Sequence, residues 1–171
     1  MPSFVEESLE AIGARVVRMR GPLLLAGDTV GLTGEVARKS DFEKGFPIHY
    51  AEREGEIVPD PWIWDDQALL VHVRGKGLVI ITGCGHSGIV NTISYAREMT
   101  GVKEVHAVMG GFHLTGGLFE PIIGPTVRTL SEFDPRWMIP THCTGWKATR
   151  ELQNHFGERF IQNSVGTVYQ F

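Results

Sequence analysis

The chain has 171 residues, of which 42% are hydrophobic and 21% are charged. These proportions are typical of one globular domain with a hydrophobic core, and they exclude a disordered chain. The formal net charge of −4 comes from acidic and basic residues that are mixed along the chain, so the long basic runs of a nucleic-acid-binding protein are absent.

The sequence also argues against membrane insertion and export. The longest apolar stretches, such as residues 23–26 and 78–81, are far too short to span a bilayer. The first residues lack the basic start and the apolar run of a secretory signal. Cys84 and Cys143 each lie inside a histidine-containing motif, which argues against a structural disulfide. We therefore expect a soluble cytoplasmic protein without membrane or nucleic-acid partners.

The N-terminal part of the chain predicts a short helix and two strands before a long loop. Residues 3–13 have apolar residues at helical spacing, and Ser3 starts a capping-box pattern. Two short strands are expected at residues 15–20 and 22–26. Residues 31–64 are rich in charge, glycine and proline and show little periodicity. They are interpreted as a long ordered loop, or alternatively as a flexible excursion.

From residue 65 onward, strand and helix patterns alternate. The predicted strands are residues 67–73, 77–81, 104–109 and 136–139, with two short final strands at 160–162 and 167–171. The predicted helices are residues 88–99, 121–133 and 145–156. This alternation favours α/β layers, and we treat residues 1–171 as a single partial domain that contains the long loop.

Three segments share one arrangement, in which an apolar strand is followed by a glycine or proline break and then by a histidine. The three histidines are His86, His113 and His142. Strand ends of open α/β sheets are where ligand sites gather, and neutral imidazole is the commonest metal ligand. A single buried histidine is more often a hydrogen-bonded structural residue. The repeated arrangement instead favours a metal site that keeps one position for water.

Other residues of these segments could contribute ligands or bind an anion. Cys84 could add a thiolate, although both cysteines also suit the role of small buried residues at tight turns. The N-terminus of a helix binds anions through free N–H groups, and the alternative at each position is an ordinary helix cap. Two helix starts follow the histidines, at Ser87, Gly88 and Asn91 and at Thr144 and Gly145.

Four motifs in chain order resemble a known family. They read Asp65-Asp-Gln-Ala-Leu, Gly83-Cys-Gly-His-Ser-Gly-Ile-Val-Asn, Gly110-Gly-Phe-His-Leu and Pro140-Thr-His-Cys-Thr-Gly. Together they are similar to the metallo-β-lactamase-fold hydrolases. More narrowly, they are similar to the 7,8-dihydropterin-6-methyl-4-(β-D-ribofuranosyl)aminobenzene-5′-phosphate synthase-like subgroup. The resemblance covers residues 20–171, and it is more specific for the family than for a substrate.

The resemblance implies a fold and a ligand set. The family's full domain is a four-layer αββα sandwich of two similar halves, with a His-x-His-x-Asp-His loop in the N-terminal half. That motif does not occur in this sequence. The resemblance therefore implies an α/β chain that corresponds to the C-terminal half of the sandwich. It places His86, His113 and His142, with Cys84, in or near the metal site.

The resemblance also implies an activity that depends on a partner. We expect a hydrolase-type or phosphoribosyl-transfer-type domain that acts on a small molecule with a divalent metal, Zn, Fe or Mn. The metal would lower the pKa of a bound water from 15.7 to about 7. The remaining ligands would come from a second polypeptide that carries the N-terminal half, or from a homodimer. The alternatives are a degenerate or dimeric module that binds a metal or an anion without turnover, and a structural module.

Overall fold

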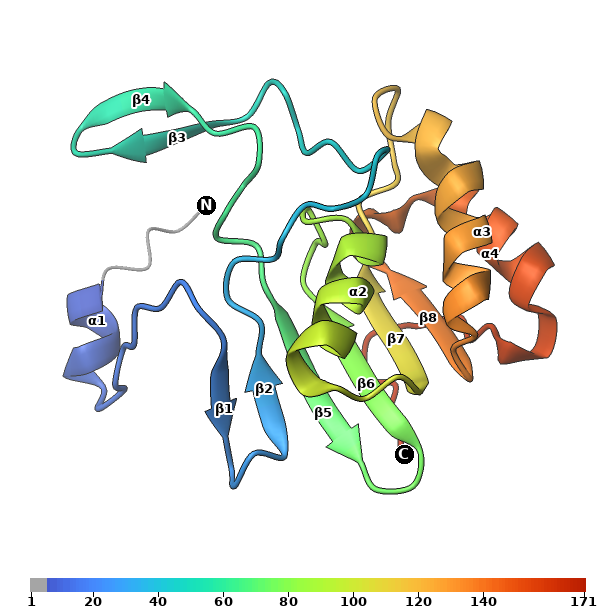
Figure 1. The fold of residues 1–171 in the computed structure, drawn as a ribbon. Coiled ribbons are helices and arrows are strands. Elements are labelled where there is room, and N and C mark those ends of the chain that lie inside the picture. The colour runs from blue at the N-terminus through green and yellow to red at the C-terminus, as the bar shows by residue number, and fades with distance from the viewer. Residues whose placement is uncertain (1–5) are drawn as a thin grey trace.

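The computed structural model describes residues 6–171 and contains one six-stranded sheet with the order β1-β2-β5-β6-β7-β8 (Figure 1). Strands β1, β2, β5 and β6 are antiparallel neighbours, whereas β6, β7 and β8 are parallel. The six strands are β1 (Leu23–Leu25), β2 (Val30–Leu32), β5 (Ala68–Val73), β6 (Gly77–Thr82), β7 (Val105–Gly111) and β8 (Trp137–Thr141). The parallel part of the sheet is the α/β layer that the alternating sequence pattern predicts.

Helices connect the parallel strands and pack on one face of the sheet. Helix α2 (Ile89–Thr100) joins β6 to β7, and α3 (Ile123–Phe133) joins β7 to β8, as crossover connections between parallel strands require. Helix α4 (Trp146–Phe156) follows β8. The shorter helical elements are α1 (Glu6–Ala11) and the 3₁₀ turns η1 (Glu120–Ile122), η2 (His142–Thr144) and η3 (Gly157–Arg159). No helix within residues 6–171 is long and apolar enough to cross a membrane.

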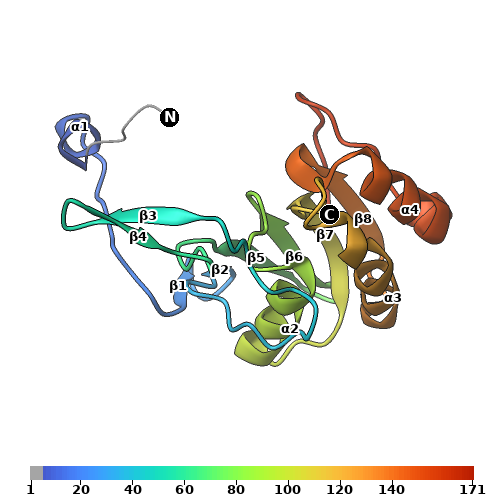
Figure 2. The same cartoon turned by 90° about the horizontal axis from the view of Figure 1, so that it is seen from above.

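The two faces of the sheet are buried by different parts of the chain. Leu78 and Ile80 of β6 belong to the core formed with the apolar sides of α2, α3 and α4. On the opposite face, Val79, Ala107 and Ile139 are buried. The partly buried residues that pack against these three include Ile161, Tyr169 and Phe171, from the last segment of the chain. Figure 2 shows this segment on the side of the sheet away from α2.

The predicted strands and helices between residues 67 and 156 are confirmed, with shifts of one or two residues at their ends. The two predicted final strands are wrong. Phe160 makes one isolated bridge to Met138, and residues 167–171 form no strand. Their apolar side chains lie across the face of the sheet instead of extending its edge, so side-chain burial replaces strand pairing.

The N-terminal predictions need two further corrections. Residues 15–20 form no strand, and the sheet ends at β1. The predicted loop at residues 31–64 begins with the end of β2 and contains a separate hairpin of β3 (Tyr50–Arg53) and β4 (Glu56–Pro59). Ser3, the predicted helix cap, lies outside the described residues.

Candidate metal centre

The three histidine segments meet at one edge of the sheet. Strands β6, β7 and β8 are adjacent and parallel, so their carboxyl ends lie side by side. His86 follows β6 by four residues, His113 follows β7 by two, and His142 follows β8 directly. The predicted convergence of the strand ends is therefore a consequence of the parallel topology.

His86 and His113 form the first cluster at this edge. Their ring centroids lie 4.3 Å apart, with the ring planes nearly perpendicular. Both ring nitrogens of His113 are buried and have no hydrogen-bond partner among the described residues. Burial, followed by the nearby His86, lowers the pKa of His113 to about 4. His113 is therefore a neutral imidazole with an unused lone pair at neutral pH, which is the form that binds a metal.

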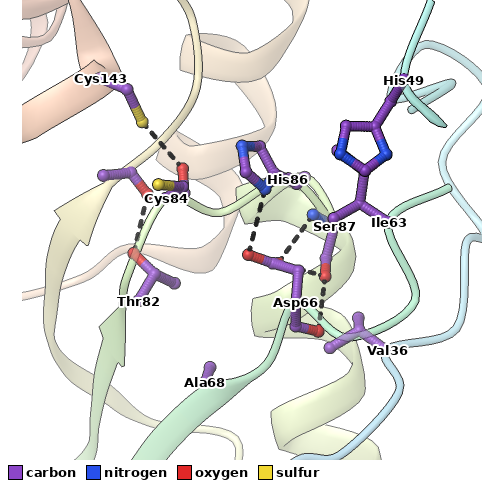
Figure 3. Close-up of polar contacts among 12 residues, drawn as sticks. Val36, His49, Ile63, Asp66, Ala68, Thr82, Cys84, His86, Ser87 and Cys143 are labelled. Carbon is purple, nitrogen blue, oxygen red and sulfur yellow. Dashed lines mark hydrogen bonds and ion pairs between the residues drawn. The ribbon is translucent and has the colours of Figure 1, made fainter. Parts of the chain in front are cut away.

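A fixed carboxylate lies beside His86. Asp66 Oδ1 is 3.9 Å from His86 Nδ1, and Asp66 Oδ2 accepts hydrogen bonds from the backbone N–H and the hydroxyl of Ser87 (Figure 3). Burial lowers the pKa of His86, and the Asp66 carboxylate opposes that shift. At this distance Asp66 and His86 form no hydrogen bond, so the carboxylate acts on the imidazole through its charge.

His142 lies in a second cluster with the two cysteines. Cys84 Sγ is 3.0 Å from His142 Nε2, and the Cys143 thiol donates a hydrogen bond to the backbone oxygen of Cys84 at 3.1 Å. Burial raises the pKa of the Cys143 thiol to about 11. Ligand atoms of His142, Cys84 and Cys143 lie within 4.8 Å of one another, and this group does not include His86 or His113.

Backbone strain accompanies both clusters. His113 and His142 have φ values of +46° and +52°, which place two non-glycine residues in the left-handed region. Such conformations persist where the surrounding structure imposes them, and they gather at functional sites.

The predicted anion site at the start of α2 is filled by the protein itself. The buried carboxylate of Glu43 accepts hydrogen bonds from Val90 N at 2.9 Å and from Asn91 N at 2.8 Å. The amide of Ser87 donates to Asp66, and a Cβ on Gly88 would lie 2.2 Å from the Glu43 carboxylate. These positions therefore bind internal carboxylates instead of an external anion.

Asn91 and Thr144 are buried and have structural hydrogen bonds. The Asn91 side-chain oxygen accepts from the amides of Lys39 and Ser40, which ties the loop before Glu43 to α2. The Thr144 hydroxyl donates to Thr141 O and accepts from Phe112 N. A Cβ on the neighbouring Gly145 would meet the side chain of Thr115 at 2.6 Å. These side-chain contacts are structural. The start of α4 has no side-chain cap, so anion binding at Thr144 and Gly145 stays a prediction.

A cleft of about 120 Å³ opens beside the first cluster. His86 and His113 lie on one side of it. Its apolar walls are formed by Phe42, Phe112, Leu118, Phe119 and Ile122. The aromatic contact extends to His113 itself, whose ring centroid lies 4.4 Å from that of Phe119. The cleft is suited to the apolar part of a small molecule held next to the two imidazoles.

No family model matches the chain, but individual proteins do. The 7,8-dihydropterin-6-methyl-4-(β-D-ribofuranosyl)-aminobenzene-5′-phosphate synthase of Methanocaldococcus jannaschii is 34% identical over 170 residues, which are 98% of this chain and 56% of that protein. The crystal structure of Tm1679, a metal-dependent hydrolase of the β-lactamase superfamily, matches with a TM-score of 0.75 and 28% identity over 90% of this chain and 57% of that one. In sequence and fold the chain is similar to this hydrolase of the metallo-β-lactamase superfamily.

A second M. jannaschii protein, which is uncharacterised, is 32% identical over 137 residues, or 80% of this chain and 48% of that protein. The chain thus spans about half the length of the relatives it matches. The mixed sheet with helices on one face matches the metallo-β-lactamase-like neighbour, as the α/β prediction requires.

Sequence reasoning missed two carboxylates that shape the site. Glu43 lies 47 residues before Val90, inside a segment without periodicity. Asp66 belongs to the first of the four motifs, but its position before β5 gives no indication of the contact with Ser87. Cys143 differs from these two carboxylates, because it directly follows a predicted metal ligand, His142, in the sequence.

Proposed function

We propose that this chain forms part of a metal-dependent hydrolase or group-transfer enzyme whose metal is held next to His86 and His113. The observation that carries the proposal is the buried ring of His113, with two nitrogens that lack a hydrogen-bond partner among the described residues. Leaving buried polar atoms unpaired costs about 1–3 kcal/mol each. A metal ion would satisfy one of these nitrogens.

The residues of the chain would each have a defined task. The charge of the Asp66 carboxylate, 3.9 Å from His86 Nδ1, would favour a proton on Nδ1, and Nε2 would then be the nitrogen that holds the metal. A divalent metal at this position, Zn²⁺, Fe²⁺ or Mn²⁺, lowers the pKa of a bound water to about 7 and so supplies hydroxide at neutral pH. The walls around Phe112 and Phe119 exclude bulk water from one side of the imidazoles.

The cleft supports a small-molecule substrate with a flat apolar part. Its walls are aromatic and aliphatic, and Lys44 in its lining supplies a positive charge for an anionic group. The name of the M. jannaschii synthase describes a product with ring systems and a phosphate. We propose a substrate of the same general chemistry, with the reaction either hydrolysis or transfer at the metal.

The metal proposal predicts a specific loss of affinity. Replacing His113 by alanine should weaken binding of Zn²⁺ by more than about 10-fold, since even residues that only support a ligand contribute 10–100-fold. His72→Ala, which changes an exposed histidine on β5, is the matched control and should leave the affinity unchanged. The measurement is competition with a chromophoric chelator. Equal affinities for both variants and the parent chain would contradict the proposal.

We further propose that a partner chain completes the site, because two imidazoles are fewer than the three protein ligands of a catalytic zinc. The edge strand β1 has exposed Leu24 and Leu25, and the hairpin of β3 and β4 has exposed Tyr50 and Ile57. Unpaired edges and apolar side chains of this kind mark contact surfaces.

The partner proposal predicts association in solution. Sedimentation of the purified chain should show self-association that strengthens with concentration, or a stable complex with a polypeptide that carries His-x-His-x-Asp-His. Alanine at Leu24, on the edge strand, should weaken this association, whereas alanine at the exposed Val168 should not. A monodisperse monomer that neither associates with itself nor binds such a polypeptide would contradict the proposal.

A further inference from the structure

The two cysteines of the chain lie close together, and the proposed metal position next to His86 and His113 uses neither of them. Cys84 and Cys143 are both free thiols, and both are half-buried. Their sulfur atoms lie within 4.8 Å of each other, and the Cys143 thiol donates a hydrogen bond to the backbone oxygen of Cys84 at 3.1 Å (Figure 3). The two residues are 59 positions apart in the sequence, so the tertiary structure brings the sulfurs together.

The end of β7 is shaped to let these two side chains meet. Cys84 follows β6 and Cys143 follows β8, and β7 lies between these two strands. Strand β7 ends in Gly111, and a Cβ there would lie 2.8 Å from Cys143 Sγ and 3.0 Å from Cys84 Cα. Because Gly111 has no side chain, the Cys143 thiol reaches across the middle strand to Cys84.

The pair is open to solvent on one side. Cys84 Sγ lies 3.0 Å from Nε2 of His142, and His142 is exposed. A small oxidant can therefore reach Cys84 from the side of His142. The Cys143 thiol differs from that of Cys84, because its hydrogen is directed at a backbone carbonyl. Together the two residues have the parts of a redox-sensitive pair, which are an accessible thiol and a second thiol beside it that can react with the first oxidation product.

We propose that Cys84 and Cys143 form a reversible disulfide when the chain reacts with a hydroperoxide. The Cys84 sulfur attacks the O–O bond and takes one oxygen as sulfenic acid, and the other oxygen leaves as an alcohol, or as water from hydrogen peroxide. The Cys143 sulfur then attacks the Cys84 sulfur and releases the sulfenic hydroxyl as water. Two thiols are oxidised, one peroxide bond is reduced, and both thiol hydrogens end in the released alcohol and water.

This modification site goes beyond the proposed function and does not depend on it. The reaction needs no metal and no partner chain, because both sulfurs belong to this chain. The disulfide would link the ends of β6 and β8 above β7, and it would take the Cys84 thiol away from His142. A dithiol reductant would reverse the change by thiol–disulfide exchange.

Oxidation of the full, reduced chain by hydrogen peroxide in the presence of a chelator tests the proposal. The remaining thiols are alkylated, and peptide mass spectrometry locates the cross-links. We expect one peptide that joins Cys84 to Cys143 within a monomer, with the loss of two hydrogen atoms and recovery of both thiols in dithiothreitol. The ratio of this cross-link to overoxidised Cys84 should be at least about 10-fold higher in the folded chain than in urea, where the two cysteines are rarely close.

The variants separate the two steps. Serine at position 143 keeps a donor for the Cys84 carbonyl, so Cys143→Ser should remain folded by circular dichroism. In that variant the sulfenic acid of Cys84 has no thiol to react with, and dimedone should trap it. In Cys84→Ser, little dimedone adduct should form at Cys143.

One further variant separates this inference from the proposed function. His113→Ala removes the proposed metal position, and it should form the same disulfide as the parent chain. The absence of a cross-link within the folded monomer, cross-links only between chains, or an equal ratio in the folded and the denatured chain would each overturn the inference.

Discussion

Gly110→Ala is expected to lower the free energy of unfolding by at least about 3 kcal/mol. Gly110 has φ +119°, a region that residues with a side chain rarely adopt, and a Cβ there would lie 2.1 Å from the backbone oxygen of Thr82. Thr82 is the residue paired with Gly110 across β6 and β7. Relief of the clash would separate the two central strands at the edge that carries the histidines, so metal affinity should fall as well.

Gly117→Ala is the matched control for this change. Gly117 lies in the loop that follows His113, and a Cβ added there would have no atom within 4 Å. Urea unfolding of both variants gives the comparison, and the control should stay within about 0.5 kcal/mol of the parent chain. If the two alanine variants were equally stable, the close approach of β6 and β7 at Gly110 would not be a real constraint.

Glu43→Ala is expected to cost about 2–4 kcal/mol, because it leaves two buried amides at the start of α2 without an acceptor. Those amides belong to Val90 and Asn91. The loop that contains Glu43 also lines the cleft, so its release should loosen the wall opposite His113. Glu43→Gln keeps the shape and one acceptor, and it should cost less than the alanine variant.

The same residue gives stability a defined pH dependence. Burial raises the pKa of Glu43 from its ordinary 4.5 to about 7. The native chain therefore keeps this proton in a range where the unfolded chain has lost it. The contribution of Glu43 is fully present below pH 4.5, declines by up to about 1.4 kcal/mol per pH unit, and is lost above pH 7.

The experiment must separate Glu43 from the histidines. The pKa of His113 is lowered to about 4, so this residue makes stability rise with pH between about 4 and 6.5, opposite to Glu43. The histidines contribute equally to the parent chain and to Glu43→Gln, so their contribution cancels when the two unfolding free energies are subtracted. The value for the parent chain minus the value for Glu43→Gln should fall from pH 4.5 to pH 7. Glu132→Gln, at an exposed position of α3, should show a constant difference.

Local sequence patterns are sufficient to predict the layered part of this protein. In residues 68–156, apolar residues recur at strand or helix spacing, because each strand or helix buries one side against a neighbour in the same α/β layer. Parallel pairing of β6, β7 and β8 then follows from the helices between them, and it brings His86, His113 and His142 to one edge.

The contacts between groups at that edge depend on the tertiary structure. Glu43 reaches α2 across 47 residues, and no periodic signal records such a contact. It fills the helix N-terminus where the sequence suggests a bound anion. The cysteines and His142 approach one another because β7 ends in glycine between the two outer strands. The sequence is therefore sufficient to identify the residue types of the site. Which side chains contact one another depends on the distances between strand ends, and local patterns do not predict those distances.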